Sequence, residues 1–228
     1  MLYLYIKGVC TMGHQIYTIG REFGSMGLLV GQKLAERLGI KYYDKELLQK
    51  AAKDSGFCEE IFENHDEKAS SSFLYSLVMD SYSPGGYTAA AFLDMPLNHK
   101  VFLAQFETIK NVAENESCVI VGRCADYALA DHDNVINVFV RADLEDRIKI
   151  ISKRMDLTEN KAKDLILKND KQRASYYNYY TSKKWGDTAS YDLCINTSKI
   201  SVDNAVDLIL DFRKYMDLKS KSGIQMPE

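Results

Sequence analysis

The chain has 228 residues, of which 46% are hydrophobic and 27% charged, and its formal net charge is −3. These values are typical of one large globular domain, or of a domain with a small inserted lobe. A slightly negative chain exerts no general attraction on nucleic acid or an anionic membrane, so any anion site must be a local cluster of arginines and lysines.

The first elements predict the opening of a βαβ unit. Residues 16–19 are apolar and predict a short buried strand, which leads into a glycine-rich turn at 20–27. A helix follows, with Val30, Leu34 and Leu38 on one face, and Gly39 ends it. Residues 40–43 predict a second strand, and after Asp44 residues 45–53 predict a helix.

The pattern loosens at residues 56–99, where serine and glycine clusters interrupt it, and we expect a mobile insertion there. Residues 101–113 then predict a helix with apolar residues on one side. The fully apolar run at 118–121 is typical of a central parallel strand that is covered on both faces.

The rest of the chain alternates strands with helices. Strands are predicted at 135–140 and 193–196, and helices at 125–129, 144–155 and 159–180, the last capped by Thr158. Ser201 is expected to cap a final amphipathic helix that frays after Leu218. The alternation predicts a doubly wound, mainly parallel sheet. We expect an N-terminal extension at 1–15, one domain at 16–216 with lid-like helices at 147–184, and a tail at 217–228.

The turn at 20–27 is the first candidate site. In a parallel sheet, ligands gather at the carboxyl ends of the strands, and glycines let backbone N–H groups converge on an anion at a helix start. The candidate phosphate-binding residues are Gly20, Arg21, Glu22, Phe23, Gly24, Ser25, Met26 and Gly27. Arg21 and Ser25 could add side-chain donors. A purely structural tight turn is the alternative.

This turn lacks two residues of the standard phosphate loop. That loop ends in Gly-Lys-Ser/Thr, in which the lysine meets the β- and γ-phosphates and the hydroxyl holds Mg²⁺. The corresponding stretch here is Met26, Gly27 and Leu28, so both the lysine and the metal-binding hydroxyl are missing.

Several motifs together resemble the bacterial cytidylate kinase-like family. They are the segment at 16–27, Tyr42-Tyr43-Asp44, the segment at 119–126, residues 169–173 with Tyr176 and Tyr177, and Trp185-Gly186-Asp187. The resemblance spans roughly residues 16–216 and implies an α/β P-loop nucleotide-kinase fold with helices on both faces of the sheet. Members usually show Gly-Ser-Gly-Gly-Arg in the loop, whereas this chain has Met26 and Leu28 at the third and fifth positions.

The resemblance also implies roles for particular residues. Arg123 matches the arginine of a Gly-Arg-Asp motif that contacts the acceptor nucleotide, and Asp126 is shifted from that motif's aspartate. Asp170 and Arg173 resemble an Asp-x-x-Arg pair that holds base and phosphate. Asp44 is placed with the substrate, and Arg147 and Arg154 are placed in the lid as cations for the transferred phosphoryl group. A strand-end salt bridge for Arg123, and solvated surface charges for the other residues, are the alternatives.

The five cysteines form no Cys-x-x-Cys pair, and Cys118 and Cys194 lie in apolar strand-like runs, where we expect reduced, buried thiols. The histidines show no metal-ligand spacing, so no protein-held metal site is predicted. We expect a cytoplasmic protein with nucleotides as ligands and with neither nucleic acid nor membrane as a partner. The oligomeric state stays open.

Two functions remain in view. The first is an enzyme that transfers the γ-phosphoryl group of ATP, with Mg²⁺, to a nucleoside monophosphate or similar small acceptor. The second is a nucleotide-binding module without turnover, which the missing loop lysine and hydroxyl favour. The sequence leaves the acceptor and the base open.

Overall fold

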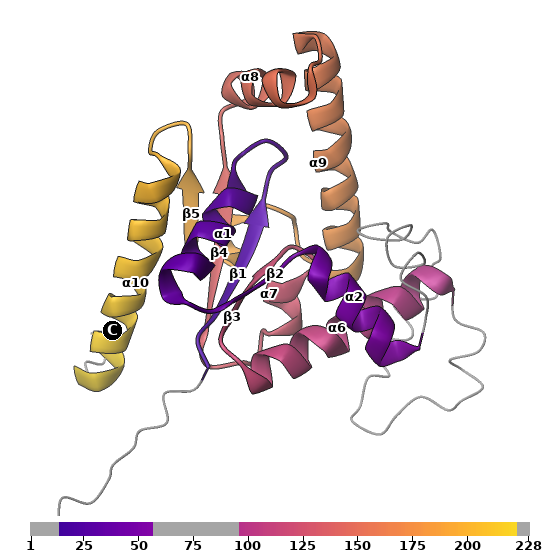
Figure 1. Ribbon diagram of the computed structural model, residues 1–228. Helices are drawn as coiled ribbons and strands as arrows, with labels where there is room; N and C mark the ends of the chain where they lie inside the picture. Colours follow the sequence, from indigo (N-terminus) through magenta and orange to yellow (C-terminus); the bar gives the residue numbers. More distant parts are fainter. Residues whose placement is uncertain (1–13, 57–95, 223–228) are drawn as a thin grey trace, which may run out of the picture.

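The computed structural model describes residues 14–56 and 96–222. Its centre is a parallel sheet of five strands in the order β2-β3-β1-β4-β5 (Figure 1). The strands are β1 (Ile16–Arg21), β2 (Lys41–Tyr43), β3 (Cys118–Val121), β4 (Val135–Arg141) and β5 (Leu193–Asn196). The predicted parallel, doubly wound sheet is confirmed.

The helices follow the strands in the predicted alternation. They are α1 (Gly27–Leu38), α2 (Lys45–Ser55), α6 (Leu97–Asn115), α7 (Ala125–Ala128), α8 (Leu144–Met155), α9 (Glu159–Thr181) and α10 (Val202–Ser222), with a 3₁₀ turn η1 (Thr188–Ser190). None of these described helices has the length and apolar character needed to cross a bilayer.

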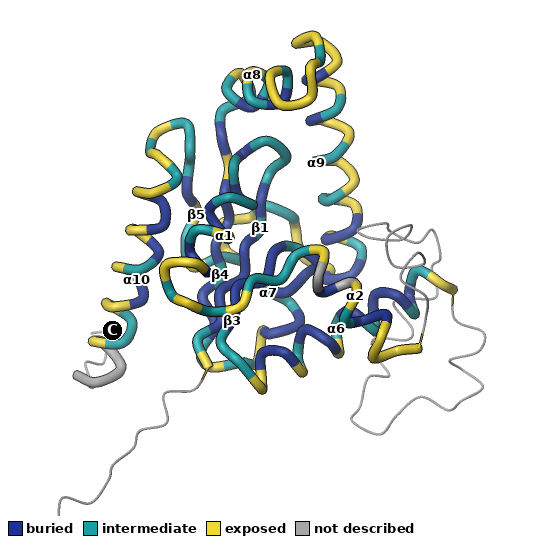
Figure 2. The backbone as a smooth tube through the Cα atoms, viewed as in Figure 1, coloured by how far each residue is buried: buried dark blue, intermediate teal, exposed yellow. Residues whose placement is uncertain are grey.

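Apolar side chains point alternately to the two faces of the sheet along each strand, and this explains why both faces are covered by helices. Tyr17, Ile19 and Val121 lie in one buried cluster with residues of α1 and α10. Ile16 and Ile120 lie in a second cluster with residues of α6 and α7. Successive strand side chains point to opposite faces, so an apolar run needs a helix layer on each side. Figure 2 shows the sheet as the most buried part of the chain.

Helices α8 and α9 stand beyond the carboxyl ends of the strands (Figure 1). Ile151, Ala162 and Ile166 form a small core between them, and Phe23 of the 20–27 loop packs against it. The lower part of α9 joins α6 through a stacked pair of rings, Phe102 and Tyr180, whose centroids are 4.0 Å apart. The predicted lid helices therefore sit directly on the candidate loop.

Several boundaries differ from the prediction. The helix α10 continues to Ser222, so the expected fraying after Leu218 is wrong for residues 219–222. Helix α6 begins at Leu97, within the expected insertion, and the insertion otherwise lies outside the described residues. Of the N-terminal extension, only His14 and Gln15 are described, and Gln15 already bonds to Ser117 and Cys118.

Two local expectations also fail. Thr158 lies at the N-cap of α9, but its side chain makes no capping hydrogen bond, whereas the Ser201 hydroxyl accepts from the N–H of Asn204. Cys118 is buried as expected, but Cys194 is exposed. Strand β5 is the edge of the sheet, and the face of the sheet on which Cys194 lies is not covered there.

Candidate functional site

The 20–27 loop crosses directly from β1 into α1 and is shaped by two residues with positive φ. Gly24 has φ +85° and Met26 has φ +63°. Glycine adopts this region freely, but a residue with a Cβ pays a steric cost of about 1 kcal/mol or more there. The family's usual glycine at the position of Met26 therefore has a physical reason, and this chain holds the same turn under strain.

Gly24 is packed against α8 and is not open to a ligand on its Cα side. A Cβ at this position would lie 3.0 Å from Cγ1 of Ile151 and 3.3 Å from Cβ of Arg147. A larger side chain at residue 24 would therefore push on the lid helix. The position needs a glycine for its φ and for this packing.

The Ser25 hydroxyl faces the interior of the protein. It lies 2.9 Å from the carbonyl oxygens of Glu22 and Val140, and the residue is fully buried. The expectation that Ser25 adds a donor toward phosphate is therefore wrong for this arrangement. Its backbone carbonyl accepts from the Thr197 hydroxyl at 2.8 Å, which ties the loop to the end of β5.

The carboxylate of Glu22 is bonded to residues outside the loop. One of its carboxylate oxygens accepts from the N–H of Ala142 at 2.9 Å and lies 3.6 Å from Nε of Arg147. Burial raises the pKa of the Glu22 carboxyl above its ordinary value, and the Ala142 and Arg147 contacts offset this only in part. Glu22 therefore fastens the loop to the start of α8.

The Phe23 side chain positions two arginines over the loop. The guanidinium carbon of Arg154 lies 5.7 Å from the centre of its ring, and that of Arg173 lies 5.6 Å from the same ring. Cations are attracted to the face of an aromatic ring at such distances. Phe23 thus brings a residue of α8 and a residue of α9 to the same loop.

These arginines line a pocket over the loop, here called the loop pocket, with a volume of about 320 Å³ including its opening. Its cationic members are Arg21, Arg154 and Arg173, and its floor is formed by Gly24, Met26, Gly27 and Leu28. The first turn of α1 leaves N–H groups without intrahelical acceptors at this floor, as every helix does. Backbone amides and three guanidinium groups make this pocket suitable for phosphate.

A second pocket lies beside the end of β3 and is here called the strand pocket, with a volume of about 360 Å³ including its opening. Its charged members are Arg21, Arg123, Asp126 and Arg173. Its aromatic members are Tyr176, Tyr177, Trp185 and Tyr191.

The turn after β3 presents Arg123 to this pocket. Gly122, Arg123 and Cys124 all have positive φ, at +75°, +53° and +56°. Arg123 is 4% exposed, and its NH1 group donates to Oδ1 of Asp44 at 3.1 Å and to the carbonyl of Val121 at 3.2 Å. The strand-end salt bridge weighed from the sequence is thus present, and it also fixes Arg123 in the pocket wall.

Asp126 places a carboxylate among these arginines. The hydroxyl of Tyr177 donates to Oδ2 of Asp126 at 2.6 Å. Burial raises the pKa of the Asp126 carboxyl, and the hydrogen bond from Tyr177 lowers it in part. A carboxylate held in this way can accept from a hydroxyl or amino group of a ligand.

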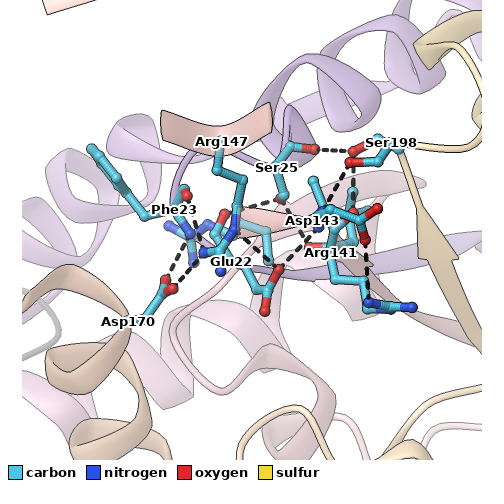
Figure 3. A network of polar contacts seen from close by, with 12 residues as sticks. Glu22, Phe23, Ser25, Arg141, Asp143, Arg147, Asp170 and Ser198 are labelled. Carbon is cyan, nitrogen blue, oxygen red and sulfur yellow. Dashed lines mark hydrogen bonds and ion pairs between the residues drawn. The ribbon is translucent and has the colours of Figure 1, made fainter. Parts of the chain in front are cut away.

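Asp170 and Arg173 do not form the pair that the resemblance implies. Asp170 bonds to Arg147 and to the loop, as Figure 3 shows, and it lines neither pocket. Arg173 donates to the carbonyl of Arg21 at 3.3 Å and lines both pockets. Arg147 is only 7% exposed and lies behind the loop, so it belongs to neither pocket wall.

The described residues do not fit a metal ion held by the protein. In residues 14–56 and 96–222, no three His, Cys, Asp or Glu side chains gather in a ligand set. The Ser25 hydroxyl points inward, and Leu28 stands where the standard loop has its metal-binding hydroxyl. Any Mg²⁺ would therefore arrive on the phosphates of a nucleotide.

Sequence reasoning missed part of the strand pocket. Tyr191 lines it and lies in a segment that carries no motif, and Cys124 lines it although the motif at 119–126 gave it no role. Tyr177 and Trp185, which belong to motifs named from the sequence, line the pocket as well. Only the fold brings these residues together, because they come from four separate segments.

Comparisons with known proteins agree with this architecture. The family model described as the cytidylate kinase-like family matches residues 16–199. A crystal structure of an uncharacterized protein from Eubacterium ventriosum is similar, with 33% identity, 88% of this chain and 99% of that chain covered, and a TM-score of 0.66. No curated protein matches the chain.

A shikimate kinase from Bacteroides thetaiotaomicron is similar in fold alone, with 12% identity, 88% of this chain and 98% of that chain covered, and a TM-score of 0.51. The fold is therefore the α/β fold of the P-loop kinases, as predicted. With the family model matching most of its length, the chain belongs to the cytidylate kinase-like family.

Proposed function

We propose that this chain transfers a phosphoryl group from a nucleoside triphosphate in the loop pocket to a small acceptor in the strand pocket. The observation that carries the proposal is the shared wall: Arg21 and Arg173 line both pockets. Two cations between a donor and an acceptor phosphate are placed where charge develops during phosphoryl transfer.

The nucleoside triphosphate, ATP in the simplest case, would supply the phosphoryl group. An oxygen of the acceptor forms the new bond to phosphorus while the bridging oxygen leaves with the nucleoside diphosphate. Arg154 and the loop amides hold the donor phosphates, and Arg21 and Arg173 stabilise the transferred group. Phosphoryl transfer needs positioning and charge neutralisation more than a nucleophilic side chain.

The strand pocket favours an acceptor that combines an anionic group with a hydrogen-bond donor. Arg123 faces the anion, and Asp126 accepts from a hydroxyl or amine. A nucleoside monophosphate with an exocyclic amine, such as cytidylate, has both groups. A small hydroxylated acid has them as well, so both classes belong in a substrate screen.

Binding without turnover is the second candidate, and one feature of the loop favours it. Leu28 stands where members of the family usually have an arginine, so one cation of the usual loop is missing. In that case Arg154 and Arg173 would hold the nucleotide but fail to assist transfer.

An assay of nucleoside diphosphate release with the full chain separates these functions. ATP and Mg²⁺ are supplied with a panel of nucleoside monophosphates and small hydroxylated acids, and equilibrium binding is measured in parallel. Turnover above the rate of ATP hydrolysis alone, with one acceptor class, supports transfer. Micromolar binding of ATP with no product from any acceptor would favour the binding module.

A further inference from the structure

One amide of the 20–27 loop is already bonded to a carboxylate of the protein itself. The N–H of Phe23 donates to Oδ1 of Asp170 at 2.7 Å, and Asp170 comes from the middle of α9 (Figure 3). Loop amides at a helix start are the groups that bind phosphate oxygens in folds of this kind. A side-chain oxygen thus takes a donor that a nucleotide could use.

The second oxygen of the same carboxylate is bound by a buried arginine. NH1 of Arg147 donates to Oδ2 of Asp170 at 2.6 Å, and it lies 3.4 Å from the carbonyl of Phe23. Arg147 is 7% exposed, so its charge is little screened by water. An amide and a guanidinium that bind two oxygens of one anion form an oxyanion site.

Arg147 also contacts a second carboxylate. Arg147 also lies 3.6 Å from the carboxylate of Glu22, so one buried cation faces two carboxylates. An ion pair between Arg147 and Asp170 that only joined α8 to α9 would need neither the amide of Phe23 nor a second carboxylate. The contact instead joins the phosphate loop, the first lid helix and the second lid helix at one point.

We infer that the Phe23 N–H and the Arg147 guanidinium form an oxyanion site that Asp170 fills when no nucleotide is bound, and that a nucleotide phosphate displaces Asp170. The inference rests on the proposed binding of a nucleotide at the loop. An internal competitor lowers the apparent affinity in proportion to the fraction of molecules in which the site is free. Displacement also removes one of the contacts between α9 and the loop, so occupancy of the loop is coupled to the lid.

The test compares Asp170→Asn with Asp164→Asn in the full chain. Asp164 is an exposed residue of the same helix, so its substitution removes one negative charge from α9 without touching the loop. The affinities for inorganic pyrophosphate and for ATP are measured by calorimetry. Asp170→Asn is expected to bind pyrophosphate on the order of tenfold more tightly than the wild type, because the amide competes less well for Arg147. Asp164→Asn is expected to bind like the wild type.

The variant Arg147→Gln tests the cation of the proposed site. It is expected to weaken pyrophosphate binding, because an anion that replaces Asp170 would lose its buried cation. If Asp170→Asn binds pyrophosphate no better than the wild type, Asp170 is a structural fastening and the inference is wrong, while the proposed function stands. If neither the wild type nor any variant binds pyrophosphate or ATP, the inference and the proposed function are both wrong.

A measurement on the wild type covers the case in which the variants fold poorly. Hydrogen exchange is followed with and without saturating pyrophosphate. We expect slower exchange at residues 20–28 and faster exchange at residues 165–172 of α9, which lose their attachment to the loop. Protection of the loop with unchanged exchange in α9 would overturn the displacement.

Discussion

The loop pocket and the strand pocket share Arg21 and Arg173 but differ in every other respect. The loop pocket adds Arg154, Glu22 and Phe23, and its floor is formed by two glycines, Met26 and Leu28. The strand pocket adds Arg123, an aspartate and several aromatic rings. The first is suited to phosphate of any origin, since amides and guanidiniums recognise only charge and shape. The second can select a ligand, because its carboxylate and rings recognise particular groups.

The two pockets also differ in how the chain holds their cations. Arg154 is exposed and is placed by the Phe23 ring, whereas Arg123 is buried and bonded to Asp44. A cation on a ring face is free to follow a ligand, but a buried and bonded one is fixed. We therefore expect the loop pocket to adapt on binding and the strand pocket to be preformed.

The largest effect is expected from the shared wall. Arg173→Ala removes a cation from both pockets, so it should weaken the binding of ATP and of the acceptor, and should lower kcat/KM by about 100-fold or more. Lys171→Ala, an exposed neighbour on α9, is the matched control. Steady-state kinetics and calorimetry check the result. An effect on one ligand only would show that the pockets are independent.

Arg154 and Arg123 each line only one pocket, so their substitution by alanine should weaken the binding of different ligands. Arg154→Ala is expected to weaken ATP about tenfold and to leave acceptor binding nearly unchanged, because Arg154 lines only the loop pocket. Arg123→Ala should weaken the acceptor more than ATP. Binding titrations of both variants with both ligands form the test. Equal losses in all four titrations would mean that donor and acceptor are not separated as proposed.

Gly24 tests how firmly the loop is packed under α8. Gly24→Ala combines a positive φ with a contact to Ile151, whereas Gly39→Ala has φ +65° and nothing within 4 Å of the added Cβ. We expect Gly39→Ala to lower the free energy of unfolding by about 1 kcal/mol, and Gly24→Ala by about 2–3 kcal/mol. Urea unfolding measures both, and equal losses would show that α8 yields freely to the new methyl group.

The smallest effect concerns the pH dependence of stability. Burial raises the pKa of Glu22 above its ordinary value of 4.5, so the folded chain binds more protons than the unfolded chain just above that pH. Stability contributed by this group therefore falls as the pH rises through the window between the unfolded and folded pKa values. Glu22→Gln should remove this fall.

Urea unfolding of Glu22→Gln between pH 4 and pH 8 checks this, with the exposed Glu36→Gln as the control. Parallel pH profiles for Glu22→Gln and the wild type would contradict the assigned cause. A steeper fall in Glu22→Gln would mean that its contact with Arg147 outweighs the cost of burial.

The sequence by itself determined the fold and the edge of the sheet at which the candidate residues lie. Apolar runs of four to seven residues, each followed by a turn and an amphipathic helix, allow few arrangements other than a covered parallel sheet. Such a sheet places the 20–27 loop, Asp44 and Arg123 at one edge, because the carboxyl ends of parallel strands meet there. These consequences follow from local periodicity and from the position of each turn along the chain.

The tertiary structure alone decided which side chains face a ligand. Asp170 and Arg173 are three residues apart on α9, yet the first bonds to the loop and Arg147 while the second lines both pockets. Ser25 resembles a phosphate donor in the sequence, and its hydroxyl is turned to the carbonyl of Val140. The direction of a polar side chain depends on which hydrogen-bond partners lie close to it after folding. The N–H of Phe23, which donates to Asp170, and the carbonyl of Val140, which accepts from Ser25, each come from a residue more than a hundred positions away in the chain.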